Sequence, residues 1–215
     1  MKNLIYLLFL LLAVACQPAA EQKETAAADA KPAGAPDALR NAFEEVNVTK
    51  MHLYATEETA PDTAAYPFVG TPLTGDLAQY LDADLQPGET GVFGTYLIEN
   101  TQFFILRVPG KYVSGDLALA GWDASASGGK LKKVADLAHR WCDEGVCHQQ
   151  DAWLIDLDDN RKLELVTRSQ STENGKLTEQ KFEVMTEDGQ GGFVKTDEAL
   201  ASLAVEKYYV MMEKK

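Results

Sequence analysis

The chain of 215 residues carries 33 acidic and 20 basic side chains, which gives a formal net charge of −13. A surface this acidic repels phosphate groups and argues against nucleic acid as a partner. Hydrophobic residues make up 46% of the sequence, which is ordinary for a globular protein and too high for a disordered chain. A folded domain with an apolar core is therefore expected.

The first residues have the pattern of a targeting segment. Lys2 gives a positive start, an apolar run extends from Leu4 to Ala13, and small residues precede Cys16. This arrangement resembles the lipobox of a bacterial lipoprotein signal peptide. The resemblance implies that residues 1–15 are a cleaved signal peptide and that Cys16 becomes a lipidated first residue with palmitate-type acyl chains. The apolar run is too short for a membrane anchor that stays uncut, because a spanning helix needs about 20 residues.

The lipid implies a place in the cell, with the protein held to a membrane of the cell envelope through Cys16. Gln17 follows the cysteine, and under the enterobacterial sorting pattern the absence of Asp there favours the outer membrane. Whether the periplasmic or the surface-facing leaflet is reached is open. Residues 16–36 are rich in Ala and Pro and lack large apolar side chains, so we expect them to form a flexible tether.

Residues 37–215 are expected to form one acidic domain of the α+β class, with a mainly antiparallel sheet and a few flanking helices. Hydrophobic patterning predicts strands at 92–99, 102–108, 117–122, 152–157, 163–168 and 176–186. His52 lies in a further strand-like segment. Asn174-Gly175 is the strongest hairpin signal of the chain. Helices are expected at 37–46, around 73–81 and after 196–198, where Leu200, Leu203 and Tyr208 share one face.

One segment between two apolar strands, DLDDNRKLELV, is a candidate cation site. Its oxygen-bearing side chains stand at relative positions 1, 3, 5 and 9: Asp156, Asp158, Asn160 and Glu164. The segment resembles a single calcium loop of the FG-GAP or VCBS type, which implies that these four supply side-chain ligands to Ca²⁺ and Lys162 a carbonyl. Arg161 stands where those loops have glycine, a position of positive φ. The alternative is a polar hairpin turn in which Asp and Asn side chains bond their own backbone.

The segment HRWCDEGVCH holds Cys142 and Cys147, with His139 and His148 just outside them. Thiolate and imidazole groups are ligands of zinc or copper, although this spacing matches no established zinc motif. In the oxidising envelope a disulfide between the two cysteines is favoured over metal or free thiols, and Glu144-Gly145 supplies the turn between them.

Catalytic motifs are missing from the sequence, since it contains no G-x-S-x-G, Walker loop or H-E-x-x-H pattern. We therefore expect a non-enzymatic binding or structural module for an unknown protein or small-molecule ligand. The alternative is a periplasmic hydrolase whose site is assembled from dispersed carboxylates. Six aromatic residues are assigned to core packing rather than to a ligand groove: Tyr96, Phe103, Phe104, Trp122, Trp141 and Trp153.

Overall fold

The computed structural model describes residues 34–55, 66–85, 91–110, 115–189, 191–196 and 202. The expected signal peptide, Cys16 and residues 17–33 of the expected tether lie outside these residues, as does nearly all of the helix expected after 196–198. Within the described ranges, no helix combines the length and apolar content needed to cross a bilayer. Ala35, near the end of the expected tether, is buried against the folded part.

The described residues form one large sheet with the strand order β1-β4-β5-β6-β7-β8-β9-β10-β11, in which β2 also pairs with β8 and β3 with β4. Neighbouring strands are antiparallel except β1 and β4, which are parallel. The strands are β1 (Glu44–Val46), β2 (Lys50–Leu53), β3 (Thr71–Pro72), β4 (Phe93–Ile98), β5 (Phe103–Pro109), β6 (Gly115–Asp123), β7 (Lys130–Asp143), β8 (Val146–Ile155), β9 (Glu164–Glu173), β10 (Lys176–Glu187) and β11 (Phe193–Lys195). The helices are α1 (Asp37–Arg40) and the 3₁₀ helices η1 (Gly75–Tyr80) and η2 (Ala83–Leu85). The expected mainly antiparallel sheet with a few helices is confirmed.

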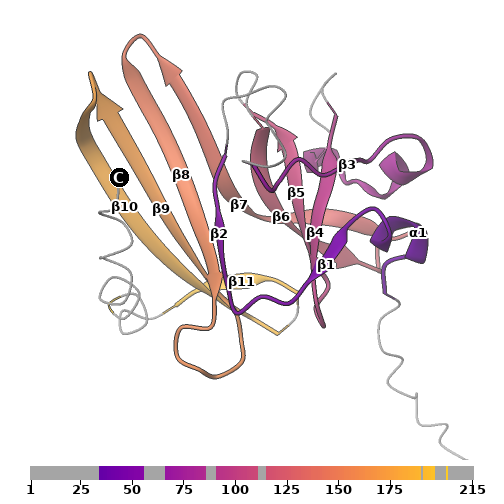
Figure 1. Cartoon of the computed structure of the whole chain (residues 1–215). Coiled ribbons are helices and arrows are strands. Elements are labelled where there is room, and N and C mark those ends of the chain that lie inside the picture. The colour runs from indigo at the N-terminus through magenta and orange to yellow at the C-terminus, as the bar shows by residue number, and fades with distance from the viewer. Residues whose placement is uncertain are drawn as a thin grey trace, which may run out of the picture. The chain divides into compact units, whose positions relative to one another are not determined.

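Strand β7 connects the two halves of the sheet. Its first part pairs with β6, and its last part, from His139 to Asp143, pairs with β8. The β6–β7 register shifts twice, at Leu117/Ala118 and at Leu119/Ala120, and such irregularities bend a strand. In Figure 1, β8, β9 and β10 accordingly lie on one side and β4, β5 and β6 on the other.

The core has three parts because side chains alternate between the two faces of each strand. The largest part joins both halves of the sheet and includes Leu53, Phe103, Ile105, Leu119, Leu154 and Leu165. A second part lies on the other face of β4–β6, where residues of α1, η1 and η2 pack on it (Figure 1); it includes Leu39, Leu85, Phe104, Leu106 and Leu131. A third consists of Trp153, Ile155, Leu157, Val166 and Val184. Phe103, Phe104 and Trp153 thus lie in three different clusters, as expected for core packing and not for one shared groove.

Two of the expected helices differ from the structure. The helix over 37–46 is wrong, because it stops at Arg40 and residues 44–46 instead pair with the sheet edge as β1. The helix around 73–81 is present only as the 3₁₀ helix η1, although Leu73 and Leu81 are buried as its pattern predicted. Strand β7 was not predicted, because polar residues such as Lys132 and Lys133 interrupt its apolar alternation.

Candidate functional site

The loop of residues 156–163 connects β8 to β9 at one end of the sheet. The two strands pair up to the base of the loop, where Ile155 lies opposite Glu164. Leu157 and Leu163 are buried just inside the two ends of the loop, whereas residues 158–162 are exposed. The loop is therefore fixed at its base by apolar packing and presents its polar residues to solvent.

Side chains of the loop bind its own backbone. The Asp156 carboxylate accepts hydrogen bonds from the backbone N–H groups of Asn160 and Arg161, at 3.0 and 2.8 Å. The Asn160 N–H also reaches Asp158 at 3.2 Å, and the Asn160 Oδ1 accepts from the Lys162 N–H at 2.7 Å. This is the bonding pattern of the predicted polar turn. Arg161 has a φ of 69°, the left-handed conformation that calcium loops reserve for glycine at this position.

The same loop brings three carboxylates together. Ligand oxygens of Asp156, Asp158 and Glu164 all lie within 4.8 Å of one another. Asn160 contacts this group, because its Nδ2 donates to Asp158 at 3.0 Å, while its Oδ1 accepts from the Lys162 N–H. Three of the four predicted side-chain ligands are carboxylates gathered within this distance, and the fourth, Asn160, bonds to one of them. Asn160 and the Lys162 carbonyl stay predictions as ligands.

Glu164 is the unusual member of this group, since it is fully buried (0% exposed). Its Oε2 accepts a hydrogen bond from the Leu157 N–H at 2.7 Å, but among the described residues its Oε1 has no hydrogen-bond partner. Burial raises the pKa of Glu164, and the negative charges of Asp158 and Asp156 raise it further against the effect of the Leu157 N–H. A buried anionic oxygen without a partner is destabilising, and a cation between the three carboxylates would compensate it. The donor set thus fits a metal ion.

A cavity of about 610 Å³ lies beside the loop. Its walls come from the 47–49 link between β1 and β2, from the 98–101 turn between β4 and β5, and from Asp156, Asp159, Arg161 and Leu163 of the loop. In Figure 1 these three segments meet at the lower end of the sheet. Sequence reasoning missed the cavity, because no local pattern indicates that such distant segments converge.

A second charged group lies in the middle of the same strands. Asp151 is buried (3% exposed) at the point where β8 changes its neighbour from β7 to β2. Its Oδ2 accepts from Arg168 at 2.5 Å and lies 3.6 Å from His52 Nε2, while Gln149 donates to its Oδ1 at 2.9 Å. Burial alone would raise the pKa of Asp151, but its contacts with His52, Gln149 and Arg168 hold it below its usual value. This group joins β2, β8 and β9.

A third titratable group lies on β6 and β7. Burial, with a contribution from the charge of Asp136, raises the pKa of Asp116 to about 7. Burial also lowers the pKa of His139, which interacts with Asp136 as well. A carboxyl group that titrates near neutral pH has the property required of a general acid. Neither Asp116 nor Asp136 was singled out from the sequence, because acids are abundant throughout the chain.

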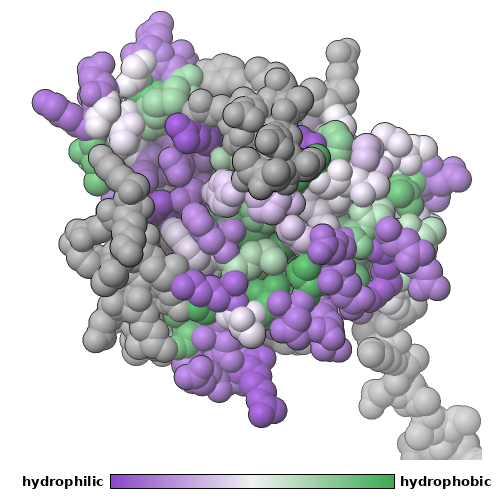
Figure 2. Space-filling model, viewed as in Figure 1, coloured by the Kyte–Doolittle hydropathy of each residue, from purple (hydrophilic) through white to green (hydrophobic). Residues whose placement is uncertain are grey.

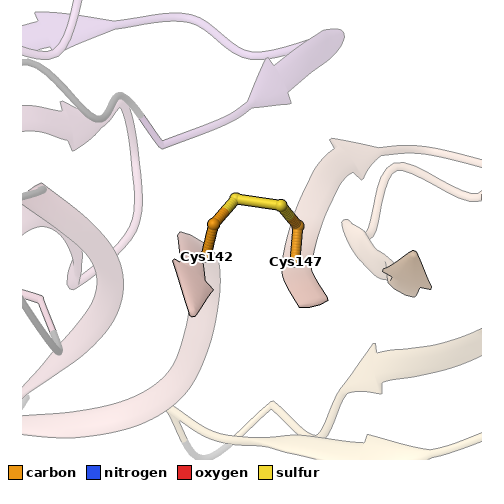
Figure 3. The surroundings of a disulfide bond; sticks show 2 residues. All are labelled: Cys142 and Cys147. Carbon is orange, nitrogen blue, oxygen red and sulfur yellow. A yellow bond between two sulfur atoms is a disulfide. The ribbon is translucent and has the colours of Figure 1, made fainter. Parts of the chain in front are cut away.

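The two cysteines form the predicted disulfide (Figure 3). Cys142 and Cys147 lie directly opposite each other on β7 and β8, with their Cα atoms 4.0 Å apart. The alternation of side chains places His139 and His148 on the other face of these strands. His148 Nδ1 lies 3.1 Å from the Ser171 hydroxyl, and its ring contacts Trp141. This geometry favours the disulfide over the interpretations of the segment as a metal site or as free thiols.

The disulfide and the two charged groups thus lie at three positions along strands β8 and β9. The disulfide lies near one end, the Asp151 group lies in the middle, and the carboxylate loop with its cavity lies at the other end. Neither a family model, nor a curated protein, nor a solved structure matches this chain.

Proposed function

We propose that this protein is a lipid-anchored lipoprotein of the cell envelope whose domain is a non-enzymatic binding or structural module, with the β8–β9 hairpin stabilised by Ca²⁺. One observation carries the calcium assignment: the buried Oε1 of Glu164, beside Asp156 and Asp158, has no hydrogen-bond partner within the described ranges. The lipobox-like sequence before Cys16 supports cleavage of residues 1–15 and attachment to a membrane, with Gln17 favouring the outer one.

The chemistry of the group favours calcium over other metals. All three gathered side chains offer carboxylate oxygens, whereas zinc and copper sites use imidazole or thiolate. Ca²⁺ accepts 6–8 oxygens in irregular geometry, so water and backbone carbonyls can complete a shell begun by three side chains, whereas Mg²⁺ demands a near-ideal octahedron. Modules outside the cytoplasm typically bind Ca²⁺ with Kd values of about 10⁻⁴–10⁻³ M, which a site with few charged ligands can reach.

Each side chain has a distinct part in this proposal. The backbone N–H groups of Asn160 and Arg161 fix the Asp156 carboxylate, so its position needs little reorganisation on binding. Glu164 contributes the buried oxygen and connects the ion to β9, while Asp158 closes the group from the exposed side. The ion supplies positive charge that offsets three neighbouring carboxylates. The expected consequence is a stiffer hairpin at this end of the sheet.

A thermal melt of the full-length protein with Ca²⁺ and with chelator tests the site. At about 100-fold excess over Kd, Ca²⁺ should add about 2.7 kcal/mol, which corresponds to a rise in Tm of roughly 5–10 °C for a domain of this size. The double variant Asp156→Asn/Asp158→Asn should lose this rise. Its melt in chelator should lie below that of the wild type, because Asn has one acceptor oxygen whereas Asp156 accepts from two backbone N–H groups. The matched control is Asp76→Asn/Asp84→Asn, which changes two exposed acids in η1 and η2. A wild-type melt that is the same in both conditions would reject the cation site.

The lipid anchor is tested separately. Cells grown with a palmitate analogue should label the wild-type protein, and Cys16→Ser should abolish the label and leave the unprocessed precursor. Cys142→Ser serves as the control, because that cysteine belongs to the disulfide of the folded domain. Label that persists in the Cys16→Ser protein would contradict the assignment.

A periplasmic hydrolase is the second candidate, and the raised pKa of Asp116 is the observation that favours it. A general acid with this pKa would give hydrolysis that falls as pH rises through about 7. Nitrophenyl esters, phosphates and glycosides are suitable probes. Turnover that disappears in Asp116→Asn while the variant stays folded would support the enzyme. Equal background rates for the two proteins would reject it.

A further inference from the structure

The cavity beside the β8–β9 loop has the size and construction of a small-molecule site. Its volume of about 610 Å³ lies within the range of roughly 300–1,000 Å³ that is usual for ligand pockets. Its walls are three connections between strands, and such connections on a rigid sheet commonly carry binding residues. Figure 2 shows that on the face viewed there, hydrophobic side chains form a band across the lower middle that hydrophilic ones border.

The charged side chains that line the cavity restrict the net charge of a ligand that can bind there. Glu99, Asp156 and Asp159 bring three carboxylates, and Arg161 brings the guanidinium among the lining residues. An anionic ligand would meet this excess of negative charge within a protein that is itself strongly acidic. With Ca²⁺ held at Asp156, a ligand that carries only positive charge would be repelled by that ion and by the Arg161 guanidinium. The mixed lining therefore favours a neutral ligand.

Hydroxyl groups fit this lining best. Carboxylates only accept hydrogen bonds and a guanidinium only donates them, whereas a hydroxyl does both. Asn47, Asn100 and Thr49 add amide and hydroxyl groups of the same dual capacity. The aliphatic residues Val48, Ile98 and Leu163 also line the cavity. Ile98 and Leu163 are buried in the core, so the half-buried Val48 is the aliphatic side chain that offers contact to C–H groups. A ring with several hydroxyls on one side and C–H groups on the other meets both requirements.

The polar walls are held in place before any ligand arrives. Asn47 Nδ2 donates to Glu99 Oε2 at 2.7 Å, which ties the first wall to the second. In the third wall, the Asn160 and Arg161 N–H groups hold Asp156. Fixed polar groups lower the ordering cost of binding.

We propose that this cavity binds a small neutral polyhydroxylated ligand of the carbohydrate class. The proposal goes beyond the cation site, because Glu99, Asp159 and Arg161 stand outside the group of three carboxylates. Asp156 belongs to both, so Ca²⁺ changes the charge at one wall of the cavity. The binding groups themselves are side chains of the three connecting segments, of which Asn47, Glu99 and Asp156 are held by hydrogen bonds.

Chemical-shift mapping of the full-length ¹⁵N-labelled protein tests the proposal with galactose, N-acetylglucosamine and maltose, each added up to about 10 mM. Spermidine and glutamate serve as cationic and anionic probes. At least one sugar should shift amide resonances of the 47–49, 98–101 and 156–163 segments. Each titration is run with Ca²⁺ and with chelator, so a failed calcium site and a failed sugar site give different results.

Asp159→Gly is the sharpest variant, because glycine readily takes the observed φ and only the carboxylate is lost. It should weaken sugar binding by about tenfold or more, as expected for one charge-assisted hydrogen bond. Asn174→Gly is the matched control, since it makes the same change at a positive φ at the far end of β9 and should leave binding unchanged. The proposal fails if no sugar shifts these segments, if only spermidine or glutamate does, or if Asp159→Gly binds as tightly as the wild type.

Discussion

The two ends of strands β8 and β9 are built in opposite ways. At one end, β7–β8 and β9–β10 close through the turns Glu144-Gly145 and Asn174-Gly175, which meet through a hydrogen bond from Asn174 N–H to the Gly145 carbonyl. The positive φ values at this end fall on Asn, Gly and one Glu, and Asn and Gly are the residues that such turns favour. The disulfide lies next to the turns. At the other end, a longer loop holds Asp159 and Arg161 at positive φ beside Glu164, whose Oε1 has no partner in the part of the chain that the structure describes. Local conflict of this kind is typical of functional sites, so the loop end is where binding should be sought.

The largest effect is expected between the two ends, at the Asp151–Arg168 pair. Arg168→Met keeps much of the side-chain volume but leaves the buried Asp151 charge without its strongest partner. The free energy of unfolding should fall by about 3 kcal/mol in denaturant titrations. Lys181→Met is the control on β10, because its ion pair with Glu183 is exposed and should contribute less than about 1 kcal/mol. A loss no larger than that of the control would show that the pair does not join the strands.

Acid provides an independent check on this pair. The pKa of Asp151 is lower in the folded protein than in the unfolded chain, where it is about 3.9. The stabilisation from the ionised carboxylate is therefore fully present above about pH 4 and is lost as the pH falls through the folded-state pKa. Unfolding experiments from pH 6 down to pH 2 should show a smaller acid-dependent loss in Asp151→Asn than in the wild type. Equal slopes would contradict the assigned shift.

Removal of the disulfide should lower stability only at the end of β8 and β9 that carries the two short turns. Cys142→Ser/Cys147→Ser reopens a very short loop, for which the chain-entropy model gives a loss of about 2 kcal/mol. Thermal melts should show a lower Tm, while the proposed calcium-dependent rise keeps its size because the carboxylates lie at the other end of β8. Loss of the calcium response in this variant would mean that the two ends are coupled.

Glu164→Gln tests the other end of β8 and β9, where the loop of residues 156–163 lies. The amide keeps an oxygen for the Leu157 N–H and replaces the unpartnered anionic oxygen with a donor facing Asp156 and Asp158. In chelator, the variant should be more stable than the wild type by about 1 kcal/mol, and it should no longer respond to Ca²⁺. Glu173→Gln, at the exposed far end of β9, is the control and should change neither value. A destabilised Glu164→Gln protein would show that the buried charge has a partner.

These contrasts show what local sequence can reveal. The Asn174-Gly175 turn, the apolar strands around Phe103 and Leu119, and the cysteine pair were predictable, because turn chemistry, alternation and redox compartment act within a few residues. The Asp156 loop was found as a pattern, but the burial of Glu164 depends on packing that the pattern does not encode. The partners of Asp151 and the walls of the cavity come from distant segments, and only the strand pairing of β2 with β8 and of β8 with β9 brings His52 and Arg168 together.

The smallest effect tests backbone strain directly. Arg161→Gly should relieve a left-handed conformation that costs a non-glycine residue about 1 kcal/mol, but it also loosens the unfolded chain, so a net gain of only about 0.5 kcal/mol is expected. Gly175→Ala makes the opposite change in the Asn174-Gly175 turn, where φ is 77° and, its chain neighbours aside, no described residue lies within 4 Å of the added methyl group. It should lose about 1 kcal/mol through strain alone. Denaturant midpoints of the two variants should therefore move in opposite directions, and a loss in both would mean that Arg161 makes contacts that outweigh its strain.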